Sequence, residues 1–432
     1  MKINYSFLFI LPIALILAAD NMFIELTAPD NPSGMARNLS FILKATAGIS
    51  FLYSAYYFRR MSTYMRVAFL LLTCYVFGLT FESKYFYNSF MVYPHVFQKI
   101  LLYYNIFFIY TFYKGNYHLK FSHLVYFILL IFALNVAIIN PDSLSISSFT
   151  NHERGVWSSS IYMLVFPFFY FLSKYFYKGG IYNLAMTFIA LFCIFFFQHR
   201  TVWITTSFML VIYYLLIKFK AQEKINFIGK LMPVATVVAV LGICSSAFLF
   251  SMHPEILDKV AESFSDIENY DKQGTGGWRM IQIKSYIPFV EDNFFFGMRF
   301  AGFELPIQFY RDDIDAPVFE DGNGHFFHSF YLEIFFYLGL IGMILFLIPA
   351  LYAIVKGIRR KGLTTNQIIL FSFVVSGFVF GLSYVLPPFY YAGLGWCIVA
   401  LENETLHQRS YLTDFAYRMR QKRMLQSRHL VT

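Results

Sequence analysis

Residues 330–355 read FYLEIFFYLGLIGMILFLIPALYAIV and contain one charged side chain, that of Glu333. A helix of this length is long enough to cross the ~30 Å hydrocarbon core of a bilayer. Apolar side chains on all of its faces are typical of a helix in lipid, where the backbone polar groups must be satisfied within the helix. The stretch therefore predicts a membrane-spanning helix and sets the fold class of the chain around it.

The composition extends this prediction to the whole chain. Of the 432 residues, 58% are hydrophobic and 14% are charged, against roughly 25% charged in soluble domains. We expect an all-α polytopic membrane protein with about twelve transmembrane helices, the first of them retained rather than cleaved as a signal peptide. The predicted spans are residues 4–19, 39–56, 65–81, 92–112, 121–139, 159–173, 181–197, 201–217, 231–250, 330–355, 367–386 and 388–401.

The positions of the basic residues predict the orientation. With the N-terminus in the cytoplasm, 22 of the 34 lysines and arginines fall in the loops and termini predicted to be cytoplasmic. The short loops predicted outside hold few, among them Arg37, Lys84 and Arg154. Because cytoplasmic loops of membrane proteins are enriched in Lys and Arg, both termini are predicted to be cytoplasmic. The net charge of +9 comes from basic residues at span ends and in the tail, as in membrane proteins, so it does not indicate a nucleic-acid partner.

The spans divide the chain into four parts. These are residues 1–250 with nine spans, 251–329 as a large extracytoplasmic loop, 330–401 with three spans, and 402–432 as a basic cytoplasmic tail. In the loop, apolar spacing predicts a helix over 257–267, a break at 274–277 and a second helix from Trp278 to about Tyr286. The tail fits either a helix on the anionic leaflet or a solvated segment.

Arg200 lies between the segments 181–197 and 201–217 and follows His199. One helix of ~37 residues would far exceed the bilayer, so we expect two helices with a turn between them. A guanidinium at this depth is costly unless an anion or water meets it. Arg200 could therefore hold a phosphate that projects from a lipid, or it could reach the interface as an ordinary snorkelling arginine.

Arg279 follows Trp278 after two glycines, in Gly276-Gly277-Trp278-Arg279. Free backbone N–H groups at a helix start and a guanidinium would together form an anion site. The alternative is a salt bridge, since residues 251–329 contain 14 acidic side chains against six basic ones. An acidic loop does not attract a diphosphate at long range, so any anion site must be local.

His325 and His328 lie where the loop re-enters the membrane, shortly before Glu333. An imidazole can take a proton from a sugar hydroxyl near neutral pH. No third and fourth metal ligand occurs at suitable spacing, so we expect no metal site. A covalent role for Ser329 is disfavoured because neighbouring residues do not face each other on a helix. The alternative for His328 is a structural histidine at the interface.

Three stretches resemble the O-antigen ligase family. His328-Ser329, nine residues and then Gly339-Leu340-Ile341-Gly342 resemble its His-(Asn/Ser/Gln)-x9-Gly-x-x-Gly motif. His199-Arg200-Thr201-Val202-Trp203 resembles its Arg-x-x-Trp helix start. Trp278-Arg279 followed by Asn293-Phe294-Phe295-Phe296-Gly297 resembles its Trp-Arg … Asn-Pro-x-x-Gly segment, with Phe294 at the proline position. The resemblance covers about 181–350, whereas the first 180 residues agree only in hydropathy.

The resemblance implies a C-type glycosyltransferase fold in the bacterial inner membrane, with the active loop in the periplasm. The donor would be a glycan on undecaprenyl diphosphate and the acceptor a hydroxyl of lipid A core or a similar glycolipid or glycan. Arg200 and Arg279 would bind the diphosphate, and His328 would act on the acceptor, with supporting positions at His325, His199 and Trp278. Transfer would invert the anomeric centre without a metal or cofactor.

The motif does not separate ligases from repeat-unit polymerases or from pilin-type protein O-glycosyltransferases. We favour a ligase-like function because of the His328 motif and keep a polymerase as the alternative. A lipid-linked glycan transporter is the alternative of another class, and it predicts charges inside the spans and repeated halves. Charges near the middle of a span are few, namely Lys44 and Lys99. A non-catalytic assembly partner would not need the Arg and His residues. The other expected partners are membrane lipids.

Overall fold

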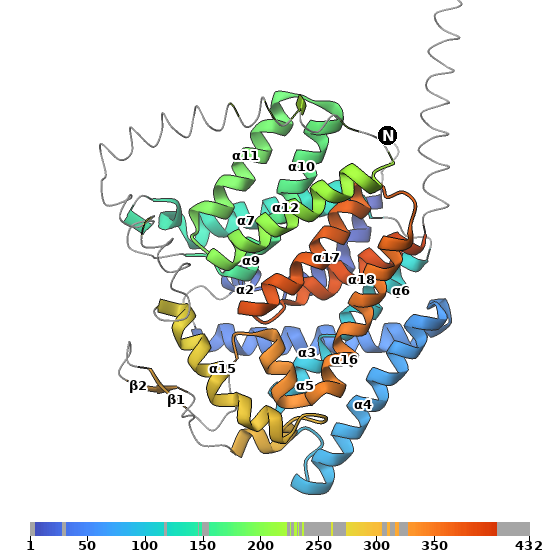
Figure 1. Ribbon diagram of the computed structural model, residues 1–432, viewed down its shortest axis with the longest axis vertical. Coiled ribbons are helices and arrows are strands. Elements are labelled where there is room, and N and C mark those ends of the chain that lie inside the picture. Colours follow the sequence, from blue (N-terminus) through green and yellow to red (C-terminus); the bar gives the residue numbers. More distant parts are fainter. Residues whose placement is uncertain are drawn as a thin grey trace, which may run out of the picture.

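The computed structural model describes residues 5–27, 32–115, 119–145, 147–148, 155–222, 274–304, 309–311, 316–318 and 327–403, with isolated residues between 225 and 261. Within these ranges the chain forms a bundle of helices (Figure 1). One short hairpin accompanies them in the described ranges, and it pairs strands β1 (Phe309–Arg311) and β2 (Ala316–Val318) antiparallel.

The helices before residue 150 are η1 (Tyr5–Ile10), α1 (Leu11–Leu17), α2 (Asn21–Thr27), α3 (Pro32–Tyr56), η2 (Phe58–Arg60), α4 (Thr63–Tyr87), α5 (Pro94–Leu101), α6 (Tyr104–Lys114), α7 (Phe121–Leu134), the π-helical turn η3 (Asn135–Ile139) and η4 (Pro141–Leu144). The later helices are α9 (Ser158–Met163), α10 (Val165–Lys178), α11 (Ile181–Phe196), α12 (Arg200–Lys220), α15 (Gly274–Asp292), η5 (Arg299–Glu304), α16 (Phe330–Arg359), α17 (Thr365–Ser383) and α18 (Pro388–Glu402).

These helices cover every predicted span except residues 231–250, which lie outside the described residues apart from the isolated positions 232 and 236. In the described part of the chain, five helices are long and apolar enough to cross a membrane, and they comprise Thr63–Tyr87, Phe121–Ile139, Arg200–Lys220, Phe330–Arg359 and Thr365–Ser383. The fold is therefore compatible with a polytopic membrane protein. The basic tail from residue 404 and the helix predicted over 257–267 also lie outside the described residues, apart from the isolated position 261.

Two local predictions were wrong. The second loop helix was predicted to begin at Trp278, but α15 already begins at Gly274, so residues 274–277 are helical, and it continues to Asp292 through Pro288. Glycines are tolerated in a first turn, where the N–H groups have no intrahelical partner in any case. The predicted span 92–112 is divided into α5 and α6 at Leu102 and Tyr103.

Aromatic side chains fill the space between the helices. The Tyr162 ring on α9 lies 4.4 Å from that of Phe380 and 5.3 Å from that of Phe373, both on α17. The Tyr162 hydroxyl lies 2.8 Å from Ser376 Oγ. Large rings bury much apolar area, and a buried phenol needs a polar partner. Aromatic side chains thus fill the interior of the bundle as well as lying on its surface.

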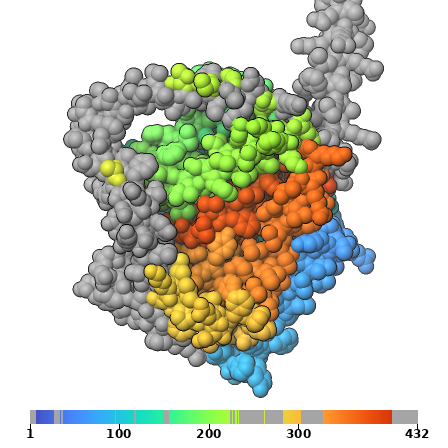
Figure 2. Space-filling model, in the orientation of Figure 1, coloured from blue at the N-terminus to red at the C-terminus, as the bar shows by residue number. Residues whose placement is uncertain are grey.

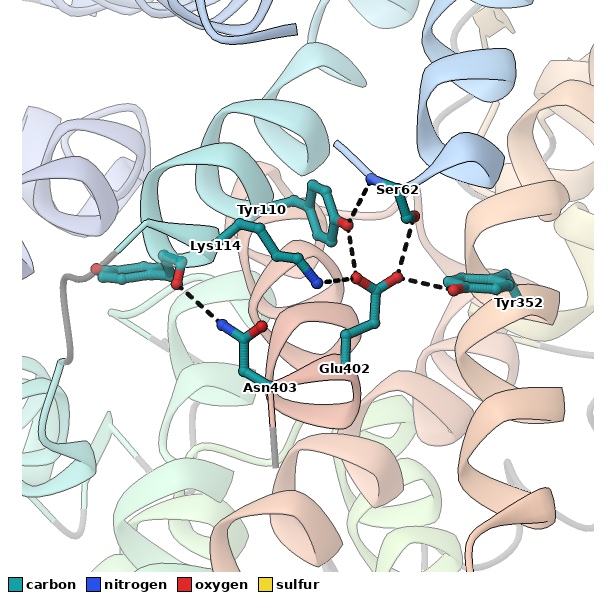
Figure 3. A network of polar contacts seen from close by, with 7 residues as sticks. Ser62, Tyr110, Lys114, Tyr352, Glu402 and Asn403 are labelled. Atoms are coloured by element: carbon teal, nitrogen blue, oxygen red, sulfur yellow. Dashed lines mark hydrogen bonds and ion pairs between the residues drawn. The ribbon is translucent and has the colours of Figure 1, made fainter. Parts of the chain in front are cut away.

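A polar network around the Glu402 carboxylate joins four helix ends (Figure 3). Glu402, at the end of α18, accepts hydrogen bonds from the hydroxyls of Tyr110 at 2.6 Å, Tyr352 at 2.7 Å and Ser62 at 3.1 Å. It also forms an ion pair with Lys114 at the end of α6. The Glu402 side chain is only 5% exposed, so these donors replace the water that a carboxylate requires.

A second contact lies between the end of α12 and the start of α17. The Leu363 N–H donates to the Lys220 carbonyl at 2.7 Å, and Lys220 Nζ donates to the carbonyls of Ile358 and Arg360. The residues of this contact and of the Glu402 network come from the ends of spans predicted to face the cytoplasm. We call this end of the bundle, defined by Ser62, Lys114, Lys220, Leu363 and Glu402, the inner end.

We predict that Lys114→Met lowers the free energy of unfolding by about 3 kcal/mol, because it leaves a buried carboxylate without its cation. The double variant Lys114→Met/Glu402→Gln should regain much of this loss, since an amide can hydrogen-bond to the three hydroxyls. Thermal unfolding in detergent measures both. Lys84→Met is the control, because Lys84 bonds Asn88 on the exposed surface and such contacts contribute less than about 1 kcal/mol. Equal losses in the single and double variants would contradict the prediction.

Candidate functional site

Arg200 is the first residue of α12, directly after a sharp turn. Gln198 has a φ of 52°, a backbone conformation that is uncommon for residues other than glycine. The turn ends α11 and lets α12 run back across the bundle (Figure 1). Residues 181–197 and 201–217 are therefore two helices, as predicted. The Arg200 side chain is half-buried.

The neighbours of Arg200 hold this turn in place. The His199 ring is buried, and its Nε2 atom lies 2.7 Å from the Val156 carbonyl oxygen. The Trp203 indole N–H donates to the Ile194 carbonyl at 3.0 Å, which ties the first turn of α12 back to α11. His199 and the tryptophan of the Arg-x-x-Trp stretch thus orient the helix start that carries Arg200.

His328 lies just before α16. Ser329 is the N-cap of that helix, and its side chain accepts a hydrogen bond from the Leu332 N–H at 3.4 Å. The His328 side chain is half-buried, and its ring centroid lies 6.4 Å from that of Tyr384, the residue that follows α17. His328 therefore lies beside the end of α17.

Arg200 and His328 lie at the same end of the bundle. The end of α12 meets the start of α17 at Leu363, and the two helices pack closely, so they are antiparallel. The start of α12 is consequently beside the end of α17, about 31 Å from the inner end for a helix of this length. We call this opposite end, defined by His199, Arg200, His328 and Tyr384, the outer end. Figure 2 shows α12, α17, α16 and α15 side by side on one face.

The backbone of Trp278 and Arg279 lies in the opening turns of α15. The buried Tyr286, two turns further along, has its ring 4.9 Å from that of Phe327 and 5.1 Å from that of Phe336. The helix that carries Arg279 therefore packs against the residues next to His328. The side chains of Trp278 and Arg279 and the whole of His325 lie outside the described residues.

Two glycines of the predicted motifs meet at a break in α16. Gly339 has φ 60° and ψ −161°, and Gly297 has φ 68°. A Cβ atom on Gly297 would lie 2.5 Å from the Leu338 nitrogen, and one on Gly339 would lie 2.5 Å from the Gly297 nitrogen. Only glycine allows such a close approach of two backbones at these dihedral angles.

The loop after α15 satisfies the backbone groups that this break releases. The Leu340 N–H donates to the Phe294 carbonyl at 2.8 Å, and the Ile341 N–H donates to the Phe295 carbonyl at 3.2 Å. In return, the Met298 N–H donates to the Phe336 carbonyl at 2.7 Å. Backbone hydrogen bonds thus connect the segment after Arg279 to the helix after His328, and they give the motif glycines a physical role.

An ion pair between Lys99 and Glu333, which was not predicted from the sequence, lies one turn along the chain from His328. Lys99 on α5 bonds the Glu333 carboxylate on α16, whose side chain is 3% exposed. The sequence did contain an indication that Lys99 and Glu333 form a pair. Single charges inside predicted spans are costly unless they are paired, and Lys99 and Glu333 have opposite signs.

A second polar group at the outer end was also missed. The Glu25 carboxylate accepts hydrogen bonds from the Trp157 indole at 2.8 Å and from the Asn135 amide at 2.9 Å. Asp20 accepts one from Ser160 Oγ at 2.5 Å. Burial raises the pKa of Asp20, the hydrogen bonds oppose this shift and the nearby Glu25 charge adds to it. Trp157 follows Val156, so this group adjoins His199.

We predict that Gly339→Ala destabilises the protein by about 3 kcal/mol, because alanine is strained at this φ and ψ and its methyl group overlaps the Gly297 backbone. Gly48→Ala is the control. Gly48 lies in α3 with open space around it, so an added methyl group should change the stability by less than about 1 kcal/mol. Thermal unfolding of both variants in detergent checks the difference, and equal stabilities would contradict the role of the glycine contact.

Residues 185–347 match a family model described as O-antigen ligase. The matched segment contains Arg200, Arg279, His328 and both contacting glycines. No curated protein matches the chain. The family match confirms the resemblance of this segment to the O-antigen ligase and polymerase superfamily that the sequence motifs indicated.

Proposed function

We propose that the protein is an O-antigen ligase-like glycosyltransferase. It moves a glycan from undecaprenyl diphosphate to an acceptor hydroxyl of lipid A core or a similar glycan, at the periplasmic face of the bacterial inner membrane. The observation that supports this most is the common location of Arg200 and His328 at the outer end. That end is a helix length away from the basic inner end, so the positive-inside rule assigns it to the periplasm.

In this proposal the donor diphosphate binds to two helix starts. Arg200 opens α12, and Arg279 lies in the opening turns of α15. The first N–H groups of a helix lack intrahelical acceptors, and the helix dipole favours negative charge there. The guanidinium of Arg200 at such a start, and that of Arg279 about a turn and a half into α15, would add positive charge and can bind phosphate oxygens bidentately. This explains why a local anion site can exist beside an acidic loop.

His328 then acts on the acceptor. The acceptor oxygen attacks the anomeric carbon of the donor sugar while the bond from that carbon to the diphosphate oxygen breaks. The acceptor proton passes to the His328 imidazole, and undecaprenyl diphosphate leaves. One displacement inverts the anomeric centre. The two arginines stabilise the negative charge that develops on the leaving diphosphate, which is electrostatic catalysis and requires no metal.

A repeat-unit polymerase is the second candidate, since the family match fits polymerases as well as ligases. It would use the same donor site and the same chemistry, with another lipid-linked repeat as the acceptor. A lipid-linked glycan transporter is less well supported. That hypothesis depends on free charges within the spans, and Lys99, one of the two such cations, is neutralised by Glu333.

We predict that His328→Ala and Arg279→Ala each abolish glycan transfer, by at least a hundredfold, while expression and membrane insertion stay unchanged. Arg200→Lys should also lose most activity, because an ammonium does not replace a bidentate guanidinium. Transfer from a purified lipid-linked donor measures all three. Lys84→Met serves as the control on the exposed surface. Near wild-type transfer in any of the three variants would show that its assigned role is wrong.

Glycolipid profiles of a deletion strain should separate the two candidate functions. For a ligase, we expect all polymer to disappear from lipid A while long chains remain on the lipid carrier. For a polymerase, we expect a single repeat unit on the lipid A core. Complementation with the wild-type gene restores the profile in both cases. Unchanged glycans in the deletion strain would contradict both functions.

A further inference from the structure

We infer that the half-buried Lys99–Glu333 ion pair is a positioning device that orients His328 for transfer. The inference rests on the proposed function, in which His328 acts on the acceptor. The two residues lie on different helices, α5 and α16, and are far apart in the sequence. Neither residue touches the proposed reacting atoms, so the role assigned here is positional and not catalytic.

Glu333 is built into the turn that His328 leads into. Its backbone N–H donates to the Ser329 carbonyl at 3.0 Å, and Ser329 directly follows His328. Its side chain is 3% exposed, whereas that of Lys99 is 26% exposed. Lys99 Nζ also lies 5.3 Å from the ring centroid of Tyr337, one turn further along α16. The ammonium thus contacts the same face of α16 at two successive turns.

The outer part of α16, residues 330–338, depends on such external contacts. The break at Gly339 separates it from the rest of the helix, so the network around Glu402 at the inner end does not hold it rigidly. Towards α17, the Tyr331 hydroxyl donates to the Phe378 carbonyl at 2.8 Å. Towards η5, the Met298 N–H donates to the Phe336 carbonyl. Towards α5, the ion pair with Lys99 provides the polar contact.

An ion pair suits this position better as a geometric constraint than as a source of stability. Desolvation largely cancels the Coulomb attraction of a buried pair, and apolar side chains of similar size are often as stabilising. Apolar contacts, however, are not directional, whereas a charged hydrogen bond fixes both distance and angle. The pair therefore determines where the first turn of α16 lies against α5, and with it the position of the His328 ring beside Tyr384.

The test uses the full-length protein in detergent with the double variant Lys99→Met/Glu333→Met, which removes both charges and keeps similar side-chain volumes. We expect a nearly unchanged unfolding temperature, at least a tenfold loss of kcat and less than a twofold change in KM for the donor. The swapped pair Lys99→Glu/Glu333→Lys should regain at least a third of the wild-type kcat. The control is Lys114→Met/Glu402→Gln at the inner end, which removes both charges there, keeps an acceptor for the three hydroxyls and should keep its kcat. Wild-type kcat in the double variant would overturn the inference.

A second readout does not depend on transfer. The rate at which diethyl pyrocarbonate modifies His328, measured by mass spectrometry of its peptide, reports the environment of the ring. We expect a change of at least threefold in the double variant and a return towards the wild-type rate in the swapped pair. If wild-type protein transfers no glycan, the proposed function fails while this measurement still decides the positional role. If the double variant does not insert, Glu333→Gln is measured in its place. An unchanged rate would overturn the inference.

Discussion

The outer half of the structure depends on the backbone hydrogen bonds at the break in α16. A helix interrupted within a membrane must satisfy its released N–H and C=O groups with protein, because lipid offers no partners. Phe294, Phe295 and Met298 supply those partners, and the close approach that this needs is available because Gly297 meets Gly339. The loop after α15 therefore supplies the backbone hydrogen bonds that α16 lacks at its break.

This contact relates the proposed diphosphate site to the proposed acceptor site. Arg279 lies on α15, before one side of the contact in the chain, and His328 lies just before α16, which carries the other side. The break also allows the first turns of α16 to be oriented separately from the remainder of that helix. The outer turns are held by the Lys99–Glu333 ion pair and by the hydrogen bond from Tyr331 to α17. The inner part is held by the hydrogen bond from Tyr352 to Glu402. Polar contacts at the outer end therefore orient the proposed site, whereas those at the inner end stabilise the bundle.

The sequence predicted the helical segments well because each required only a local property. An apolar run such as 330–355 or 201–217 must be helical in lipid whatever it packs against. A prediction failed where a local preference was overruled, as at 274–277, where the glycines form the start of α15 instead of a loop before it. The π turn at Asn135 and the break at Gly339 were missed too, because their stability comes from residues far away in the chain.

By itself, the sequence determined that the chain is a membrane protein, where most of its helices lie and which residue types could bind an anion or move a proton. The tertiary structure alone decided that Arg200 and His328 share one end, that Gly297 packs on Gly339 and that Lys99 neutralises Glu333. The physical reason is that hydrophobicity and helix formation depend on neighbouring residues, whereas buried charges and backbone breaks are stabilised by partners from other helices.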